Sequence, residues 1–202
     1  MSIAGNHMAK QAEDENFGRY TSYLYYLFSR SFPSMKKFYS FILSDLSKRH
    51  FSSLLDIGSG PGILDAAIAS SRPRAQVYGI DPSPYMVRIA RSRYGNAKNL
   101  HFSTGRNTSI RPKRHFDTII TTLSFHHWAV KRDALEYISG YLARNGTMII
   151  YEFVKPENKL ILEGSHSLSV REAKGYSDMK GLKLQSVKVR GQYIVVEFRK
   201  RN

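Results

Sequence analysis

The residues with the clearest chemical potential form one stretch, Asp56-Ile57-Gly58-Ser59-Gly60-Pro61-Gly62. Glycines allow a tight turn, and a helix that starts after such a turn offers bare backbone N–H groups to a ligand. Asp56 stands two positions before the first glycine, where a carboxylate disfavours pyrophosphate and favours a cation such as the ammonium group of an amino acid. We therefore expect this stretch to bind a ligand with a cationic end, through Asp56, Gly58, Ser59, Gly60 and Gly62.

The glycine spacing argues against a dinucleotide site. The dinucleotide fingerprint is Gly-x-Gly-x-x-Gly, whereas Ile63 occupies the place of its third glycine here. A nucleotide-dependent oxidoreductase on a similar sheet is therefore the weaker alternative. A plain strand–turn–helix, with glycines present only for packing, is the other.

A second acidic residue follows about 20 residues after the turn. Asp81 ends the apolar segment Val77-Tyr78-Gly79-Ile80, which predicts a strand. A carboxylate at that place can accept hydrogen bonds from both hydroxyls of a ribose. Together, the two stretches resemble the class I S-adenosylmethionine-dependent methyltransferases. The resemblance runs from about residue 50 to the C-terminus and implies that Asp56 to Gly62 hold the methionine end of the cofactor and Asp81 its ribose.

The resemblance assigns further residues to the cofactor site. Met86 occupies a position that packs on the adenine in this family, although core packing is an equal explanation. Family members often carry Gly-Asp-Ala where this chain has Gly105-Arg106-Asn107, so Arg106 replaces the acid that bonds the adenine amine, and Asn107 can still bond the adenine edge. The resulting set of further cofactor contacts is Pro82, Met86, Arg106, Asn107, Thr122 and Leu123.

Two histidines follow the predicted strand Phe116–Thr122, in Ser124-Phe125-His126-His127-Trp128. Ligands of open α/β sheets lie at the carboxyl ends of the strands, and histidine can act as a general base near neutral pH. His126 and His127 are therefore the candidate catalytic residues; alternatively they shape the pocket or bind the cofactor's carboxylate. Two adjacent histidines do not make a metal site, and we expect no metal.

The segment with the two histidines also narrows the class of methyl acceptor. It resembles the small-molecule branch of the family, the ubiquinone/menaquinone and sterol type. It differs from the Asp/Asn-Pro-Pro-aromatic motif of methyltransferases that act on adenine amines in DNA and RNA.

Periodicity and the resemblance predict an α/β fold. We expect a seven-stranded, mostly parallel sheet with helices on both faces and an antiparallel C-terminal hairpin. The chain divides into a mobile tail (1–16), an N-terminal helical cap (17–50) and the cofactor-binding domain (51–202). Helices are predicted over Ser34–Lys48, Lys131–Ala143 (stopped by Asn145-Gly146) and Ser169–Lys180, and the later strands over Thr147–Phe153, Leu182–Val189 and Tyr193–Phe198.

The predicted cap is rich in aromatic residues. Tyr20, Tyr23, Tyr25 and Tyr26 either face the cofactor and a flat acceptor or pack a helix onto the core. Tyr20 is the first candidate for a cofactor contact, because it follows Gly18.

Composition bounds the function further. The chain of 202 residues has no cysteine, which excludes disulfides, cytosine-C5 methylation and arsenic methylation. No signal peptide or membrane-spanning run is visible, so we expect a cytoplasmic protein. The net charge of +15 favours RNA or an anionic substrate, or reflects a solvated basic surface.

These observations predict a methyltransferase that uses S-adenosyl-L-methionine, releases S-adenosyl-L-homocysteine and methylates an unidentified small molecule at oxygen, nitrogen or an acidic carbon. The alternatives are an RNA methyltransferase that uses the basic surface and a non-catalytic nucleic-acid-binding protein with this fold. The oligomeric state stays open.

Overall fold

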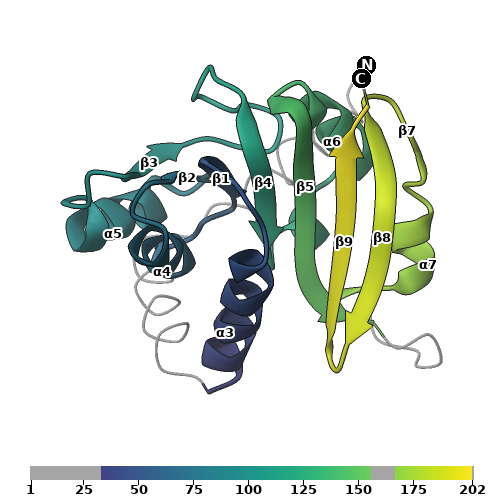
Figure 1. Ribbon diagram of the computed structural model, residues 1–202, viewed down its shortest axis with the longest axis horizontal. Coiled ribbons are helices and arrows are strands. Elements are labelled where there is room, and N and C mark those ends of the chain that lie inside the picture. Colours follow the sequence, from purple (N-terminus) through teal and green to yellow (C-terminus); the bar gives the residue numbers. More distant parts are fainter. Residues whose placement is uncertain (1–32, 156–166, 202) are drawn as a thin grey trace, which may run out of the picture.

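A computed structural model describes residues 33–155 and 167–201. Its centre is one mixed sheet with the strand order β3-β2-β1-β4-β5-β9-β8-β7 and with β6 beside β5 (Figure 1). β1 to β5 run parallel, and β9, β8 and β7 are antiparallel to their neighbours. The strands are β1 Ser53–Ile57, β2 Gln76–Asp81, β3 Leu100–Thr104, β4 Phe116–Thr122, β5 Leu142–Val154, β6 Ser167–Leu168, β7 Asp178–Met179, β8 Leu182–Arg190 and β9 Tyr193–Lys200.

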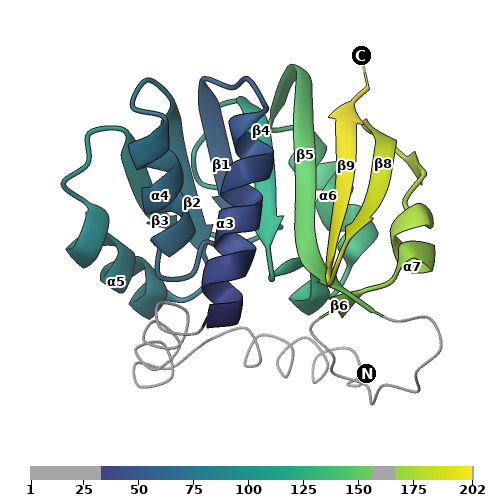
Figure 2. The ribbon, with the colours of Figure 1, turned by 60° about the horizontal axis from the view of Figure 1, so that its bottom comes forward.

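Helices cover both faces of this sheet (Figure 2). α3 (Pro33–Ser47), α4 (Ile63–Ser71) and α5 (Pro84–Tyr94) lie on one face. α6 (Lys131–Ser139) and α7 (Val170–Lys174) lie on the other, together with the single turn η1 (Phe125–His127). The predicted α/β class, the mostly parallel sheet and the antiparallel C-terminal hairpin are confirmed. The two short strands, β6 and β7, come in addition to the seven predicted.

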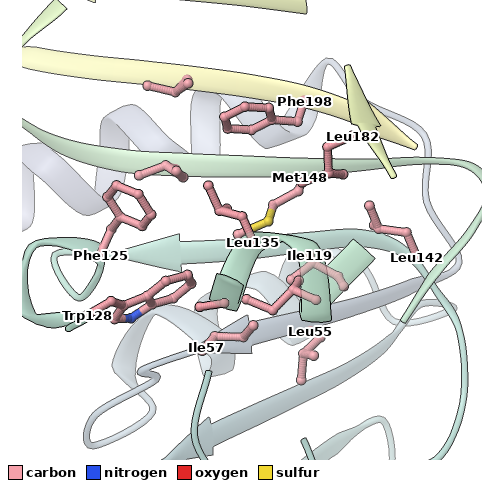
Figure 3. Close-up of a cluster of buried hydrophobic side chains, with 14 of the residues drawn as sticks. Leu55, Ile57, Ile119, Phe125, Trp128, Leu135, Leu142, Met148, Leu182 and Phe198 are labelled. Carbon is pink, nitrogen blue, oxygen red and sulfur yellow. The ribbon is translucent and has the colours of Figure 1, made fainter. Parts of the chain in front are cut away.

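Alternation along the strands creates two cores. Successive strand residues point to opposite faces, so Leu54 joins the cluster under α3, α4 and α5 while Leu55 joins the cluster under α6. Both are fully buried. Figure 3 shows the second cluster, in which Phe125 and Trp128 of the segment after β4 pack with Leu135 of α6. The aromatic residues beside the histidines thus anchor that segment to the core.

The helix starts follow ordinary capping chemistry. The Oγ atom of Ser83 accepts a hydrogen bond from the N–H of Met86 (3.4 Å), and that of Ser169 accepts one from Glu172 (3.0 Å). Each side chain satisfies a backbone donor that lacks a partner in the first helical turn. Serine is a preferred N-cap residue, so both helix starts agree with the residue types at these positions.

Two predicted helices end earlier than their patterns suggest. α6 ends at Ser139, with Gly140 as its C-cap, so the stop expected at Asn145-Gly146 is wrong. Leu142 already pairs with Phe116 of β4, and Asn145 takes a φ of 62° inside β5. The pairing with the sheet therefore overrides the helical periodicity.

α7 likewise ends at Lys174 and not near Lys180. The N–H of Gly175 bonds back to the carbonyls of Arg171 and Glu172, which closes the helix. The residues that follow enter the short strand β7.

The predicted helix over Ser34–Lys48 is confirmed as α3. Phe38, Ile42 and Leu46 are buried against the sheet, as the spacing predicts. Tyr20, Tyr23, Tyr25 and Tyr26 lie outside the described residues, as do the tail and the first part of the predicted cap. Within 33–155 and 167–201, no helix has the length and apolar character that a membrane crossing needs.

Candidate functional site

The glycine turn between β1 and α4 has an unusual backbone. Gly58, Gly60 and Gly62 all have positive φ values, of 82°, 53° and 76°. A side chain at Gly58 would also collide with Ser124, and a Cβ atom at Gly62 would lie 2.5 Å from the Phe102 ring. Both conformation and space therefore require glycine here.

The N–H groups of this turn are used inside the protein. Those of Gly58 and Ser59 donate to the carbonyl of Ile80 at 2.8 and 3.0 Å, and that of Gly60 donates to Asp81 Oδ2 at 2.8 Å. The expectation that these groups are bare is wrong. The loop is bonded to the end of β2, so it contributes shape and side chains rather than these donors.

The main cavity lies where β1, β2 and β4 end. It has a volume of about 760 Å³, including open space at its mouth. Such a crevice at the carboxyl ends of the strands is where open α/β sheets bind their ligands. It is lined by Ile57, Gly58, Gly60, Asp81, Pro82, Met86, Gly105, Arg106, Asn107, Thr122, Leu123, Ser124, His127 and Trp128.

A smaller cavity of about 310 Å³ adjoins the first and shares Gly58, Gly60, Thr122 and Leu123 with it. Asp56, Ser59 and Tyr39 of α3 also line it. Asp56 Oδ1, Ser59 Oγ and Thr122 Oγ1 are buried there without a hydrogen-bond partner. Unpaired buried polar atoms are costly, and one carboxylate with two hydroxyls is a suitable set of acceptors for the three N–H groups of an ammonium group. The amino-acid end of S-adenosylmethionine therefore fits the residues present.

Electrostatics in this region also favour a cation. Burial raises the pKa of Asp56 well above its usual range, and the carboxyls of Asp65 and Asp81 raise it further. Burial, with a contribution from Asp81, raises the pKa of Asp65 to about 7, although its own backbone N–H opposes this. Asp65 is fully buried in α4, and neither of its carboxylate oxygens has a hydrogen-bond partner. A bound cation would relieve this concentration of buried carboxyls.

Asp81 is held in one orientation at the end of β2. Its Oδ2 atom accepts from Gly60 N–H, and its Oδ1 atom accepts from Ser83 N–H at 2.9 Å. Each carboxylate oxygen can accept a further hydrogen bond. The side chain is 7% exposed and faces the main cavity, where a ribose would find two fixed acceptors.

The wall between the two cavities contains a strained residue. Leu123 has a φ of 49°, and its N–H donates to the carbonyl of Tyr151 at 3.1 Å. A positive φ at a branched side chain costs energy and often marks a functional site. Here it turns the chain directly after β4, between Thr122 and Ser124.

Beyond Leu123, the two histidines lie in η1. His126 Nδ1 is 3.0 Å from Oε1 and 3.1 Å from Oε2 of Glu152, a fully buried residue near the end of β5. The backbone N–H of His126 also points to Glu152 Oε1, at 3.3 Å. The rings of His126 and His127 are 4.0 Å apart, and His127 lines the main cavity. A carboxylate can only accept, so Nδ1 of His126 donates its proton in this pair.

The structure brings most of the predicted site residues together. All except Gly62, His126 and Tyr20 line one of the two cavities; the His126 ring contacts the His127 ring, and Tyr20 is outside the described residues. Glu152, Asp65 and Tyr39 were not among the predicted residues. A signal existed for Glu152, an acid at the carboxyl end of an apolar strand. In the described part of the chain, no group of three potential metal ligands occurs.

Comparisons with known proteins agree with this fold and with the place of the site. Residues 55–148 match the family model of a methyltransferase domain. A solved structure of an S-adenosylmethionine-dependent methyltransferase from Aquifex aeolicus has the same fold, with a TM-score of 0.74. It is 18% identical, and the match covers 92% of this chain and 100% of that one.

Curated relatives match the same part of the chain. A protein of Mycobacterium tuberculosis (strain ATCC 25618 / H37Rv), described as an uncharacterized methyltransferase, is 30% identical over 103 residues, 51% of each chain. The demethylmenaquinone methyltransferase of Thermotoga maritima is 27% identical over 113 residues, 52% of this chain and 45% of that protein. The chain spans about half the length of the relatives it matches. The glycine turn, the two acidic residues and the match over residues 55–148 identify this part of the chain as a class I S-adenosylmethionine-dependent methyltransferase domain.

Proposed function

We propose that this protein methylates a small molecule at a hydroxyl oxygen or an acidic carbon, with His126 as the general base. The observation that carries this proposal is the His126–Glu152 pair beside the cavity that Asp81 and His127 line. An acceptor of either kind must lose a proton, and a carboxylate-oriented imidazole is a common device for accepting it. An amine acceptor would need no such pair.

Different residues of the chain would bind the cofactor and accept the proton. S-adenosylmethionine supplies an electrophilic methyl group on its sulfonium. Asp56, Ser59 and Thr122 would bind its ammonium group, and Asp81 its ribose. Holding donor and acceptor in line accounts for much of the acceleration in such a displacement. His126 would accept the acceptor's proton at Nε2, while Glu152 keeps the other nitrogen protonated and the ring in place.

The relatives support the choice of acceptor class. The names of two of them, demethylmenaquinone methyltransferase and malonyl-[acyl-carrier protein] O-methyltransferase, describe acceptors with an acidic ring carbon or hydroxyl, and with a carboxyl group. For this chain the acceptor is a proposal. A reduced demethylated naphthoquinone is therefore the first compound to assay; a malonyl thioester, whose carboxylate is already ionised and needs no base, is the comparison.

The test has two steps. Calorimetry with S-adenosylhomocysteine and, separately, with NAD measures the cofactor choice; heat with NAD alone would overturn the family's cofactor for this chain. Labelled methyl transfer into a cell extract, followed by separation of small molecules, lipids, RNA and protein, then identifies the acceptor class. We expect label in small molecules or lipids, abolished in His126→Asn and retained in His101→Asn, a change at an exposed histidine of β3 that lines neither cavity. Label confined to RNA would contradict the proposed acceptor.

A further inference from the structure

The net charge of +15 is not explained by the cofactor site, and the structure gives part of it a definite place. β9 and β8 lie toward the β7 edge of the sheet; α3 packs on Tyr193 of β9, and no described helix lies over β8 on that side (Figures 1 and 2). Four exposed basic side chains belong to these two strands: Lys183, Lys188, Arg190 and Arg199.

Register shows that the four share one face. Directly opposed residues of an antiparallel pair lie on the same side of the sheet. Lys183 is opposite Arg199, Lys188 is opposite Val195, and Arg190 is opposite Tyr193. The Tyr193 ring packs 4.8 Å from Phe38 of α3, which identifies this side as the α3 face. We call these four residues the basic face.

The basic face continues into a groove at the amino-terminal end of β1 and β4. Arg199 lines this groove together with Arg49, Arg72 and Arg144. Two of these arginines have structural bonds: Arg72 donates to three backbone carbonyls, and Arg49 pairs with Asp45 and Glu197. Arg144 and Arg199 are exposed and extend the positive surface around the edge.

The carboxylates beside this surface are already engaged within the protein. Glu197, the carboxylate that β9 contributes to the α3 side, lies 3.1 Å from Arg49, which also pairs with Asp45. Asp117 lines the groove and accepts hydrogen bonds from Ser52 and Ser53. The four exposed basic residues of β8 and β9 therefore keep an excess of positive charge on this face.

The shape of the basic face favours a linear, repeating anion. β8 has nine residues, so the face extends over roughly 30 Å at about 3.3 Å per residue. It presents no exposed large apolar side chain for membrane insertion or for a protein hot spot. Val189 is 45% exposed but faces the other side, because it is opposite Ile194.

We propose that the basic face is a docking track for the phosphodiester backbone of a single-stranded nucleic acid. Lysine and arginine contacts to successive phosphates provide affinity without reading sequence. The track ends near the catalytic edge, since the N–H of Val154 at the end of β5 bonds to Gln192 beside Arg190 at 2.9 Å. The proposal goes beyond the proposed function and does not depend on which acceptor is methylated.

The experiment measures binding of fluorescent 20-nucleotide RNA and DNA by anisotropy over a range of salt concentrations. The test variant is Lys188→Ala with Arg190→Ala and Arg199→Ala. The control, Arg93→Ala with Lys98→Ala and Lys113→Ala, removes the same charge at exposed positions far from β8 and β9. Binding of S-adenosylhomocysteine and the circular dichroism melting curve check that both variants are folded.

We expect the test variant to bind either oligonucleotide about tenfold more weakly at low salt. Its slope of log Kd against log salt should fall by about 2, because each phosphate contact on a single strand contributes about 0.7. The control should retain most of the affinity. Equal binding of RNA and DNA would mean that only the shared backbone is recognised, and preference for RNA would add contacts to the 2′-hydroxyl.

Three results would overturn the proposal. One is equal weakening in the test and control variants, which would indicate general charge attraction. Another is the absence of salt-sensitive binding to both oligonucleotides. The third is preferential binding to vesicles of equimolar phosphatidylcholine and phosphatidylglycerol, lost in the test variant, which would assign the face to a membrane surface.

Discussion

The Nδ1 atom of His126, in the turn after β4, lies 3.0 Å from the Oε1 atom of Glu152 on β5. The two residues are 26 positions apart in sequence and meet because β4 and β5 are parallel neighbours. Glu152 is fully buried, whereas the His126 side chain is 11% exposed. A buried acid thus orients a base at the carboxyl edge of the sheet.

The first prediction concerns this pair. Replacing Glu152 with Gln allows an amide N–H to donate to Nδ1 of His126, which moves the ring proton to Nε2 and removes the base. We expect kcat to fall by about 10²- to 10⁴-fold, with unchanged affinity for S-adenosylhomocysteine by calorimetry. Because Glu152 acts through His126, its loss of rate should not add to that of His126→Asn in the double variant. Glu197→Gln, on the neighbouring strand β9, is the control. Unchanged activity in Glu152→Gln would exclude the pair from the chemistry.

The second prediction concerns the ammonium subsite. Asp56→Asn removes the charged acceptor in the smaller cavity while keeping its size. We expect S-adenosylhomocysteine to bind about 10- to 100-fold more weakly. This factor corresponds to the free energy of one hydrogen bond to a charged group. Asp178→Asn at the exposed strand β7 should have no effect. Equal affinities in the three proteins would place the ammonium group elsewhere.

The third prediction concerns pH and stability without cofactor. The pKa of Asp65 is raised to about 7 in the folded protein, from about 4 in the unfolded chain. Between these values the folded state binds more protons than the unfolded state, so this group's contribution to stability falls as pH rises from about 4 to 7. Asp65→Asn cannot ionise and should escape this loss.

Thermal denaturation at two pH values measures the effect. The quantity compared is the melting temperature of Asp65→Asn minus that of the unmodified protein. This difference should be several degrees larger at pH 8 than at pH 5, since about 1 kcal/mol corresponds to 2–4 °C in a chain of this length. Asp178→Asn should show no such pH-dependent difference. A constant difference at both pH values would mean that Asp65 does not titrate in this range.

The fourth prediction separates crowding from backbone strain in the glycine turn. Gly62 and Gly191 both have positive φ values, of 76° and 59°. A Cβ atom at Gly62 would meet the Phe102 ring at 2.5 Å, but one at Gly191 would meet nothing within 4 Å. We expect Gly191→Ala to lower the free energy of unfolding by about 1 kcal/mol and Gly62→Ala to lower it by about 2–4 kcal/mol, because overpacking adds to the strain. Chemical denaturation compares the two, and equal losses would show that Phe102 moves aside.

The sequence by itself determined the order of strands and helices, the glycine turn, the two acids Asp56 and Asp81, and the family. These features are local: alternating or helical periodicity, capping residues and short motifs depend on neighbours along the chain. The strand β4 has the predicted bounds for this reason. The ends of α6 and α7 were predicted too late, because strand pairing and a glycine decide them against the helical periodicity.

Only the tertiary structure decided which distant groups meet. Sequence spacing cannot place Glu152 beside His126, Asp65 near Asp56, or Tyr39 of α3 at the ammonium cavity, since sheet order and helix packing bring them together. Nor can it show that the N–H groups of the glycine turn bond to β2 rather than stay bare. The net charge was visible from composition, but the pairing of β8 with β9 placed Lys188, Arg190 and Arg199 on one face. Strand register fixes the side to which each side chain points, and this information exists only once the strands have paired.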